Sequence, residues 1–318
     1  MAGLTLFCDI PLSASARALL EETAAPHRVL AVGRDGAAAG VQLGTAEVAF
    51  GQPGTAEVLR APNLKWVHVS SAGYTRYDTQ EFRAAAAGRG LVVTNSSTVY
   101  AEPCAEHLFA FMLAQARRLP RALQTQCKGG SPLWHELRNE CPLLRGQSAL
   151  LLGFGAIAVR LVEMLRPFDL HIRAFRRRAT GDELVPLVSP AQLPEALAQA
   201  DHVINLLPDN AESRHFVSAE RLRLMRRGAV FYNIGRGTTV DQEALVGALR
   251  AGHLTAAWLD VTEPEPLPAG HPLLSAPNCF FTPHVAGGQA RESEALVRHF
   301  VNNLKRFVAG EGLLDRVM

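Results

Sequence analysis

Leu150-Leu151-Leu152-Gly153-Phe154-Gly155-Ala156-Ile157-Ala158 is the stretch that decides the fold. The apolar run before Gly153 predicts a buried strand, and the residues from Ile157 to Leu165 have helical periodicity. Glycines between a strand and a helix let a diphosphate approach the backbone N–H groups at the helix start. Gly153, Gly155, Ala156 and Ile157 are therefore predicted to bind a dinucleotide. Ala158 stands where a third glycine is frequent, which affects strand–helix packing more than binding.

Downstream of this turn, apolar runs bounded by turn residues recur, mostly with helical patterns between them. Six strands are expected, at 148–152, 172–175, 202–206, 229–234, 256–260 and 279–282. Strands that alternate with helical crossovers are typical of a doubly wound sheet of parallel strands. We expect a dinucleotide-binding domain of the Rossmann type here.

The N-terminal third has the same alternation. Strands are expected at 4–7, 48–50, 66–69 and 91–94, with helices at 15–23 and 80–87 among them. Proline is tolerated in a first helical turn, so Glu102-Pro103 is expected to open the next helix, which leads to Arg117-Arg118. A loop is expected at 129–146 and an amphipathic helix at 289–308. The prediction is an α/β protein with two Rossmann-like or flavodoxin-like domains, both with parallel sheets.

Three consecutive arginines, Arg176, Arg177 and Arg178, follow the second strand of the dinucleotide-binding domain. Arg176 stands 23 residues after Gly153, where an acidic residue would receive the ribose hydroxyls of NAD. An arginine cannot accept those hydrogen bonds, whereas guanidinium groups suit a 2′-phosphate. The predicted cofactor is NADP(H), with NAD as the alternative. The competing interpretation is a solvated basic turn.

Three separated segments each offer one reactive side chain. Arg236 lies in Asn233-Ile234-Gly235-Arg236-Gly237, Glu265 in a proline-rich stretch, and His284 in Thr282-Pro283-His284-Val285-Ala286-Gly287-Gly288. A guanidinium binds a carboxylate, a carboxylate holds an imidazole, and an imidazole moves a proton. Such a set suits the reduction of a 2-oxo acid. Arg236, Glu265 and His284 are the predicted catalytic residues.

With these motifs the chain resembles the D-2-hydroxyacid dehydrogenase family from its first strand to its last helix. The resemblance implies that Arg236 binds the substrate carboxylate and polarises the oxo group. It implies that Glu265, rather than Glu263, orients His284 and keeps its imidazolium available as the general acid near neutral pH. It further implies that the amides of Ala72 and Gly73 bind the carboxylate and that Asp260 receives the nicotinamide carboxamide. The residues expected to line the cofactor cleft are Leu207, Pro208, Ile234, Gly235, Arg236 and Gly287.

The same resemblance implies the arrangement of the chain. The final helix would return to the first domain, giving a substrate domain of residues 1–100 with 289–318, a dinucleotide domain of 101–288, and a cleft between them. Glyoxylate and hydroxypyruvate are the expected substrates, and a homodimer is the expected assembly. Two departures, Thr98 in place of a frequent glycine and Asp209-Asn210-Ala211-Glu212-Ser213 in place of a threonine-rich stretch, bear on substrate choice.

Two alternatives keep the fold. Phosphite dehydrogenases share the arginine, glutamate and histidine set, whereas formate dehydrogenases typically have glutamine at the position of Glu265, which argues against formate. A dinucleotide-sensing corepressor would bind partners without turnover, and would be expected to carry disordered extensions that we do not find before Met318.

Composition excludes other classes of function. The 318 residues are 48% hydrophobic and carry a net charge of +2, too small to predict binding to nucleic acid or a membrane surface. We expect no secretory leader and no membrane span, hence a cytoplasmic protein. The five cysteines form no C-x-x-C pair, so no metal site and no disulfide framework are expected.

Overall fold

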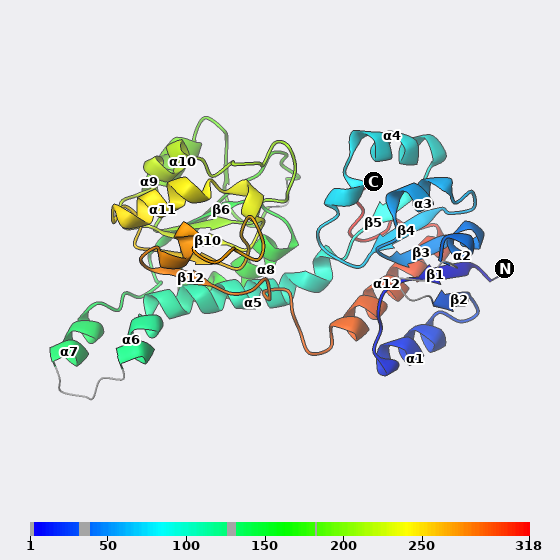
Figure 1. Cartoon of the computed structure of the whole chain (residues 1–318), viewed down its shortest axis with the longest axis horizontal. Helices are drawn as coiled ribbons and strands as arrows, with labels where there is room; N and C mark the ends of the chain where they lie inside the picture. Colours follow the sequence, from blue (N-terminus) through cyan, green and yellow to red (C-terminus); the bar gives the residue numbers. More distant parts are fainter. Residues whose placement is uncertain (1–2, 32–38, 126–131, 182) are drawn as a thin grey trace. The chain divides into compact units, whose positions relative to one another are not determined.

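The computed structural model describes residues 3–31, 39–125, 132–181 and 183–318. The chain forms two compact units (Figure 1): Met1–Tyr100 with Gly288–Met318, called unit 1, and Ala101–Gly287, called unit 2. The expected division differs from these bounds at one residue, Gly288. Both units are built on a parallel sheet, which confirms the predicted α/β fold class.

Unit 1 contains a five-stranded sheet in the order β2-β1-β3-β4-β5, and every neighbouring pair is parallel. This is the flavodoxin-like order. The strands are β1 Thr5–Cys8, β2 Arg28–Ala31, β3 Val48–Gly51, β4 Trp66–Val69 and β5 Val92–Thr94. Strand β2 was not predicted. It has only four residues and begins with the charged Arg28, so its hydrophobic periodicity is too weak to recognise.

Helices cover both faces of this sheet, with α3 and α4 on one side and α1 and α12 on the other (Figure 1). Helix α12 packs Phe300 on Phe50 with the ring centroids 4.4 Å apart and on Trp66 at 5.3 Å. The predicted return of the last helix to the N-terminal sheet is therefore confirmed. The helices are α1 Ala14–Thr23, α2 Ala39–Thr45, α3 Thr55–Arg60, η1 Thr75–Tyr77, α4 Gln80–Arg89 and α12 Glu292–Ala309.

Unit 2 contains a seven-stranded parallel sheet in the order β12-β11-β10-β9-β6-β7-β8. The order reverses between β6 and β9, as in the doubly wound dinucleotide-binding fold. All six predicted strands are present. The strands are β6 Ser148–Leu152, β7 His171–Phe175, β8 Leu187–Val188, β9 His202–Asn205, β10 Val230–Asn233, β11 Ala256–Leu259 and β12 Cys279–Phe281. The additional strand β8 has two residues, too short for a periodic signal.

The core of unit 2 joins the sheet to the helices α9, α10 and α11, which lie together on one face in Figure 1. On β11, Trp258 donates from Nε1 to Gln115 Oε1 of α5 at 3.0 Å. The elements outside the sheet are α5 Ser97–Ala116, which begins in unit 1, α6 Leu119–Thr125, α7 Pro132–Asn139, α8 Ala156–Leu165, η2 Arg166–Phe168, α9 Leu193–Gln199, α10 Ala219–Leu224, η3 Gly237–Thr239, α11 Gln242–Arg250 and η4 Pro272–Ser275.

The predicted start of α5 at Glu102-Pro103 is wrong. The helix begins five residues earlier, at Ser97, and Pro103 lies inside it. Proline has no N–H to bond the carbonyl four residues before it. In the structure that carbonyl, of Val99, accepts a hydrogen bond from Gln289 Nε2 at 3.2 Å instead. A contact from a distant part of the chain thus replaces the missing helical bond.

The loop predicted at 129–146 is also partly wrong. Residues 132–139 form α7, which starts at Pro132, a position where proline suits a helix. Arg121 of α6 pairs with Glu136 at 2.5 Å and with Glu140 at 2.7 Å. Residues 129–131 of the expected loop, and Cys127, lie outside the described residues.

Two buried histidines determine an expected pH dependence of stability. Burial, with a contribution from His299, lowers the pKa of His68 to about 3, and burial lowers that of His202 to about 4 against an opposing effect of Asp201. Both are therefore neutral in the folded chain near neutral pH, whereas an unfolded chain protonates histidine below about pH 6.5. Their contribution to the stability of the folded chain is complete above about pH 6.5. It is lost as the pH falls toward the pKa values that the two histidines have in the folded chain. Between pH 6.5 and 5, each histidine lowers the free energy of unfolding by about 2 kcal/mol.

Urea unfolding at about pH 7.5 and about pH 5 measures this loss. In His202→Gln, an amide replaces the imidazole, which bonds Tyr232 and Gln147. This variant should lose less stability on acidification than the wild type. An equal loss in both proteins would contradict the assignment.

Across the four described ranges, no helix is both long and apolar enough to cross a membrane.

Candidate functional site

The glycine turn lies where the sheet of unit 2 reverses its strand order. Gly153 has φ +103°, and a Cβ added there would come within 3.2 Å of the backbone of Leu206, which follows β9. Gly155 caps the start of α8, and an added Cβ would meet nothing within 4 Å. The first glycine thus allows close packing, and the second leaves open space at a helix N-terminus. Both features suit a pyrophosphate, and Ala156 and Ile157 form the first turn of α8.

Leu207 and Gly235 bring two strand ends together. A Cβ on Gly235 would lie 2.7 Å from the carbonyl oxygen of Leu207, so the two backbones need glycine at this point. Pro208 is exposed, Leu207 and Gly287 are half-buried, and Ile234 is only 6% exposed. Among the residues expected to line the cofactor cleft, Ile234 therefore has little side-chain surface that a cofactor could contact.

A buried amide cluster that the sequence reasoning missed supports the loop carrying Arg236. Asn205 Nδ2 donates to Asn233 Oδ1 at 2.9 Å and to Thr239 Oγ1 at 2.7 Å. Asn233 Nδ2 and Thr239 Oγ1 both donate to the carbonyl of Arg236, at 3.1 and 2.6 Å. The sequence signal that could have indicated this cluster is an asparagine near the carboxyl end of each of two predicted strands.

Arg236 is half-buried, and its Nη1 donates to the carbonyl of Gly235 at 2.6 Å. The next residue is glycine for a steric reason, because an added Cβ on Gly237 would lie 2.0 Å from the carbonyl carbon of Thr262. The arginine loop is thus pressed against the start of the segment that carries Glu265. Gln242 fixes that segment further, since its side chain bonds both the N–H and the carbonyl of Glu263.

Glu265 and His284 form a hydrogen-bonded pair, with Nδ1 of the imidazole 2.6 Å from Oε1 of the carboxylate. The structure therefore brings His284 to Glu265, as the sequence predicted, whereas the recorded bonds of Glu263 are made by its backbone to Gln242. The imidazole is about half exposed, at 49% of its side-chain area. Among the described residues Nε2 has no partner, so this nitrogen is available to an incoming ligand.

The backbone of His284 is strained, with φ +53°, a value uncommon for a residue with a side chain. Asp260 holds the loop in that form. Its carbonyl accepts the N–H of His284 at 2.9 Å, and its carboxylate accepts the N–H groups of Val285 at 2.9 Å and Ala286 at 3.0 Å. Thr282 Oγ1 donates to the same carboxylate at 2.5 Å. Asp260 is 3% exposed, and both its oxygens are used within the protein. It therefore anchors the histidine loop, and its bond to the nicotinamide carboxamide stays a prediction.

His107 of α5 is a further residue that the sequence reasoning missed. Its Nε2 lies 3.1 Å from Thr282 Oγ1 and 3.8 Å from Asp260 Oδ1. Burial lowers the pKa of His107, with Asp260 acting in the opposite direction. Burial raises the pKa of the neighbouring Cys104 thiol to about 12, with Asp260 adding to the effect and Arg236 opposing it. This thiol is consequently not a nucleophile near neutral pH.

The basic segment after β7 is organised by carboxylates. Arg176 Nη1 bonds Glu183 Oε1 at 3.0 Å, and the Glu183 pKa is held at about 2, chiefly by the backbone N–H of Thr180. Arg177 forms an ion pair with Glu212. Arg178 is exposed and forms no ion pair with any residue of the described ranges. Glu212 belongs to the segment that departs from the threonine-rich pattern, so this departure supplies a partner for the basic segment.

In unit 1, Ala72 and Gly73 lie in a turn after β4 and are half-buried. In the part of the chain that the structure describes, their N–H groups have no acceptor. Two adjacent N–H groups without an acceptor can bind an anion. Thr98, the other departure from the family pattern, bonds Asp315 of the C-terminal segment through its N–H and its hydroxyl, both at 2.8 Å.

Comparisons with known proteins agree with this geometry. Residues 109–286, all within unit 2, match the family model described as "D-isomer specific 2-hydroxyacid dehydrogenase, NAD binding domain". A glyoxylate reductase of Thermofilum pendens is 34% identical over 260 residues, which are 80% of this chain and 76% of that protein. The human glyoxylate reductase/hydroxypyruvate reductase is 31% identical over 252 residues, 78% of this chain and 75% of its own length.

A solved structure extends the similarity over almost the whole chain. It is an NADPH-dependent glyoxylate/hydroxypyruvate reductase of Sinorhizobium meliloti in complex with NADP and malonate. The TM-score is 0.75 at 27% identity, covering 99% of this chain and 97% of that one. The fold and site thus define an oxidoreductase class that uses a nicotinamide dinucleotide. Within that class, the chain belongs to the D-isomer-specific 2-hydroxyacid dehydrogenase family.

Proposed function

We propose that the protein is an NADP(H)-preferring D-2-hydroxyacid dehydrogenase that works mainly as a reductase of small 2-oxo acids, with glyoxylate and hydroxypyruvate as substrates. The observation that carries this proposal is the 2.6 Å contact between His284 Nδ1 and Glu265 Oε1, which leaves Nε2 available. The names of the relatives from Thermofilum pendens, Homo sapiens and Sinorhizobium meliloti support the choice of substrates.

The glycine turn fits a dinucleotide, since it combines open space at Gly155 with the start of α8. Gly153, Gly155, Ala156 and Ile157 would hold its pyrophosphate. When bound, a reduced nicotinamide supplies a hydride to C2 of the oxo acid. The remaining chemistry falls to the side chains of the protein.

Arg236 and the N–H groups of Ala72 and Gly73 would bind the substrate carboxylate, and Arg236 would also polarise the oxo group. The protonated imidazole of His284 would give its Nε2 proton to the oxygen as negative charge develops there. Glu265 Oε1, 2.6 Å from Nδ1, would accept a hydrogen bond from that nitrogen and fix the ring orientation. Fixed positive charge beside the forming alkoxide would account for much of the reduction in barrier.

The proposed activity is tested by mixing the purified protein with NADPH and a panel of 2-oxo acids and following the absorbance of the reduced nicotinamide. Consumption of NADPH with glyoxylate or hydroxypyruvate is the expected result. Reduction of NADP⁺ by phosphite, with no consumption in the presence of oxo acids, would favour the phosphite dehydrogenase alternative. Dinucleotide binding without turnover of any substrate would favour a corepressor-like binding protein.

The cofactor preference depends on the basic segment, and Arg178 is the member without an ion pair among the described residues. We expect Arg178→Gln to lower kcat/KM with NADPH about 10- to 100-fold, because a charge-assisted hydrogen bond to the 2′-phosphate is lost. The value with NADH should hardly change. Arg173→Gln, on the adjoining strand β7, is the matched control. Steady-state kinetics with both cofactors measure these changes. A wild-type protein that uses NADH as efficiently as NADPH would contradict the proposed preference for NADPH.

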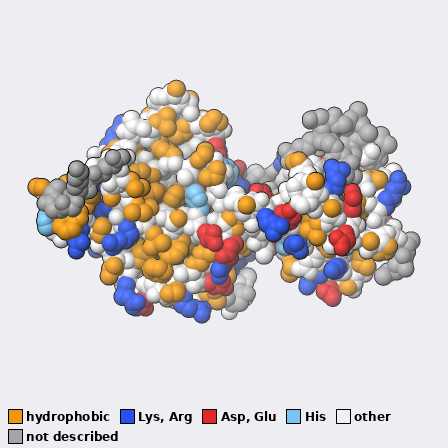
Figure 2. Space-filling model, turned by 90° about the horizontal axis from the view of Figure 1, so that it is seen from below, with side chains coloured by type: hydrophobic (Ala, Val, Ile, Leu, Met, Phe, Trp, Pro, Cys, Tyr) orange, Lys and Arg blue, Asp and Glu red, His pale blue; other side chains and the backbone are white. Residues whose placement is uncertain are grey.

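The proposed assembly is a homodimer. Three leucines near α6 and α7 have large exposed areas: 43% for Leu119, 71% for Leu123 and 67% for Leu143. Figure 2 shows hydrophobic side chains gathered around these helices, at the left of the view. Exposed apolar groups of this kind favour contact with a second copy.

The proposed location is the cytoplasm. Cys8, Cys104, Cys141 and Cys279 are free thiols in the structure, which suits a reducing compartment.

A further inference from the structure

The turn Ser70–Gly73 is held by its carbonyl groups. All four carbonyl oxygens accept a hydrogen bond within unit 1, and the donors come from the turn itself and from the segment after β5. Tyr100 Oη donates to Ser70 at 3.0 Å, Ser96 N to Ser71 at 3.1 Å, Asn95 Nδ2 to Ala72 at 2.7 Å, and Ser71 Oγ to Gly73 at 2.6 Å. The orientation of the peptide groups is thus set from the carbonyl side, away from the N–H groups proposed to bind the carboxylate.

Asn95 is the donor that acts on Ala72 itself, and it is almost fully buried at 3% exposure. Its side chain is fixed at both ends, because Nδ2 donates to Ala72 while Oδ1 accepts the N–H of Ser97 at 3.2 Å. The carbonyl of Ala72 and the N–H of Gly73 belong to one peptide group. A bond that holds this carbonyl therefore also sets the direction of the Gly73 N–H.

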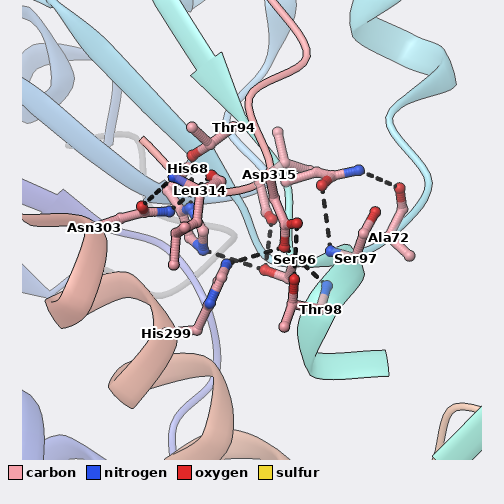
Figure 3. Close-up of polar contacts among 12 residues, drawn as sticks. His68, Ala72, Thr94, Ser96, Ser97, Thr98, His299, Asn303, Leu314 and Asp315 are labelled. Atoms are coloured by element: carbon pink, nitrogen blue, oxygen red, sulfur yellow. Dashed lines mark hydrogen bonds and ion pairs between the residues drawn. The ribbon is translucent and has the colours of Figure 1, made fainter. Parts of the chain in front are cut away.

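The C-terminal segment holds Asn95 in turn. Figure 3 shows Asp315 of this segment beside Thr98 and His299. The carbonyl of Asp315 accepts the N–H of Asn95 at 3.0 Å, and the Asp315 carboxylate accepts both donors of Thr98. Nε2 of His299 lies 3.1 Å from the same carboxylate. Asn303 bonds both backbone groups of Leu314, at 2.8 and 3.0 Å, so the segment is fixed just before Asp315.

The charge state of Asp315 suits this role. Burial acts to raise its pKa, but the close contact with His299 and the hydrogen bonds from Thr98 outweigh burial and leave the pKa below its usual value. The carboxylate is therefore ionised near neutral pH and accepts strong hydrogen bonds. Asp315 ties the C-terminal segment to the start of α5 on one side of Asn95.

We propose that Asn95 is a positioning residue for the substrate carboxylate, acting through the Ala72 carbonyl, and that Asp315 holds Asn95 in place. The inference rests on the proposed function, because it assigns the Ala72 and Gly73 amides to the carboxylate. It adds a set of residues, partly from the last residues of the chain, that determines how well the turn binds.

The test compares Asn95→Ala and Asn95→Asp with the wild type. Loss of one buried hydrogen bond should raise the KM for glyoxylate about 5- to 20-fold in Asn95→Ala. The inhibition constant of oxalate, a carboxylate that is not reduced, should rise by a similar factor. Asn95→Asp should have a larger effect, because a carboxylate oxygen would face the carbonyl oxygen of Ala72. The dissociation constant of NADPH and kcat should change much less.

Asn63→Ala is the matched control, since Asn63 also donates from Nδ2 to a backbone carbonyl but is exposed, at 3.4 Å from Gly44. Amide hydrogen exchange gives a readout independent of turnover. The Ala72 and Gly73 amides should exchange faster in Asn95→Ala than in the wild type or in Asn63→Ala.

The outcomes distinguish the positioning role of Asn95 from the proposed function. An active wild type with unchanged KM, oxalate binding and amide exchange in Asn95→Ala would overturn the positioning role and leave the proposed function standing. A wild type that neither reduces nor binds these acids would overturn both. If Asn95→Ala does not fold, Asp315→Asn replaces it in the same measurements, with a smaller rise in KM supporting the proposal and no rise overturning it.

Discussion

Replacing His284 by alanine should lower kcat for glyoxylate about 10²- to 10⁴-fold, which is the usual contribution of general acid catalysis. The KM should change much less, because the carboxylate would be bound by other groups. His284→Asn is the more informative variant, because asparagine tolerates the positive φ that His284 adopts, whereas alanine does not. Both variants should lose activity if the imidazole supplies the proton. Steady-state kinetics and a thermal melt of each variant provide the measurement.

His171→Ala is the control, because this histidine is exposed at the start of β7. Its kcat should equal that of the wild type. Near wild-type turnover in His284→Asn, together with a loss in His284→Ala, would show that the loop backbone matters and the imidazole does not. The role of His284 as proton donor would then be wrong.

Replacing Arg236 by alanine should lower kcat/KM for glyoxylate about 10²- to 10³-fold, with KM raised and kcat lowered together. The reason is that a charge-assisted bond to the carboxylate acts in the ground state, and polarisation of the oxo group acts in the transition state. Arg236→Lys should recover only part of the loss, because an ammonium cannot make the two parallel bonds of a guanidinium. Initial rates over a range of glyoxylate concentrations separate the two parameters.

Arg250→Ala serves as the control, since this arginine lies exposed at the end of α11. A KM for Arg236→Ala within twofold of the wild type would contradict the carboxylate role. In that case Arg236 would be a structural residue of its loop, where it already bonds the carbonyl of Gly235.

Much of the fold could be predicted because its signals are local. Strands β6, β9, β10 and β11 of unit 2 are mostly runs of apolar residues next to a turn, and such runs are buried on both faces of a parallel sheet. Strands β2 and β8, which lie at the edges of their sheets, were missed. Pro103 was misplaced for a different reason. The bond that makes a proline tolerable within α5 comes from Gln289, which is not a neighbour in the sequence.

In the candidate site, too, residues with a local sequence signal were predicted and residues that depend on distant contacts were not. Arg236, Glu265 and His284 were named from the sequence because each stands beside glycine or proline in a short segment with recognisable chemistry. The supporting residues were not recognised. Asn205 and Asn233 have the appearance of ordinary strand ends, and His107 that of a helical residue, until the folded chain brings them to the Arg236 and His284 loops.

The sequence by itself determined the fold class, the glycine turn and the identity of the three reactive side chains, because these depend on residue type and short-range periodicity. Only the tertiary structure decided how those groups are held. It places the Asp260 carboxylate on the N–H groups of the His284 loop, and Asn95 between Ala72 and Asp315. The physical reason is that a hydrogen bond depends on distance and direction in space. Residues 217 positions apart, such as Thr98 and Asp315, become partners only after the sheet and the last helix have packed together.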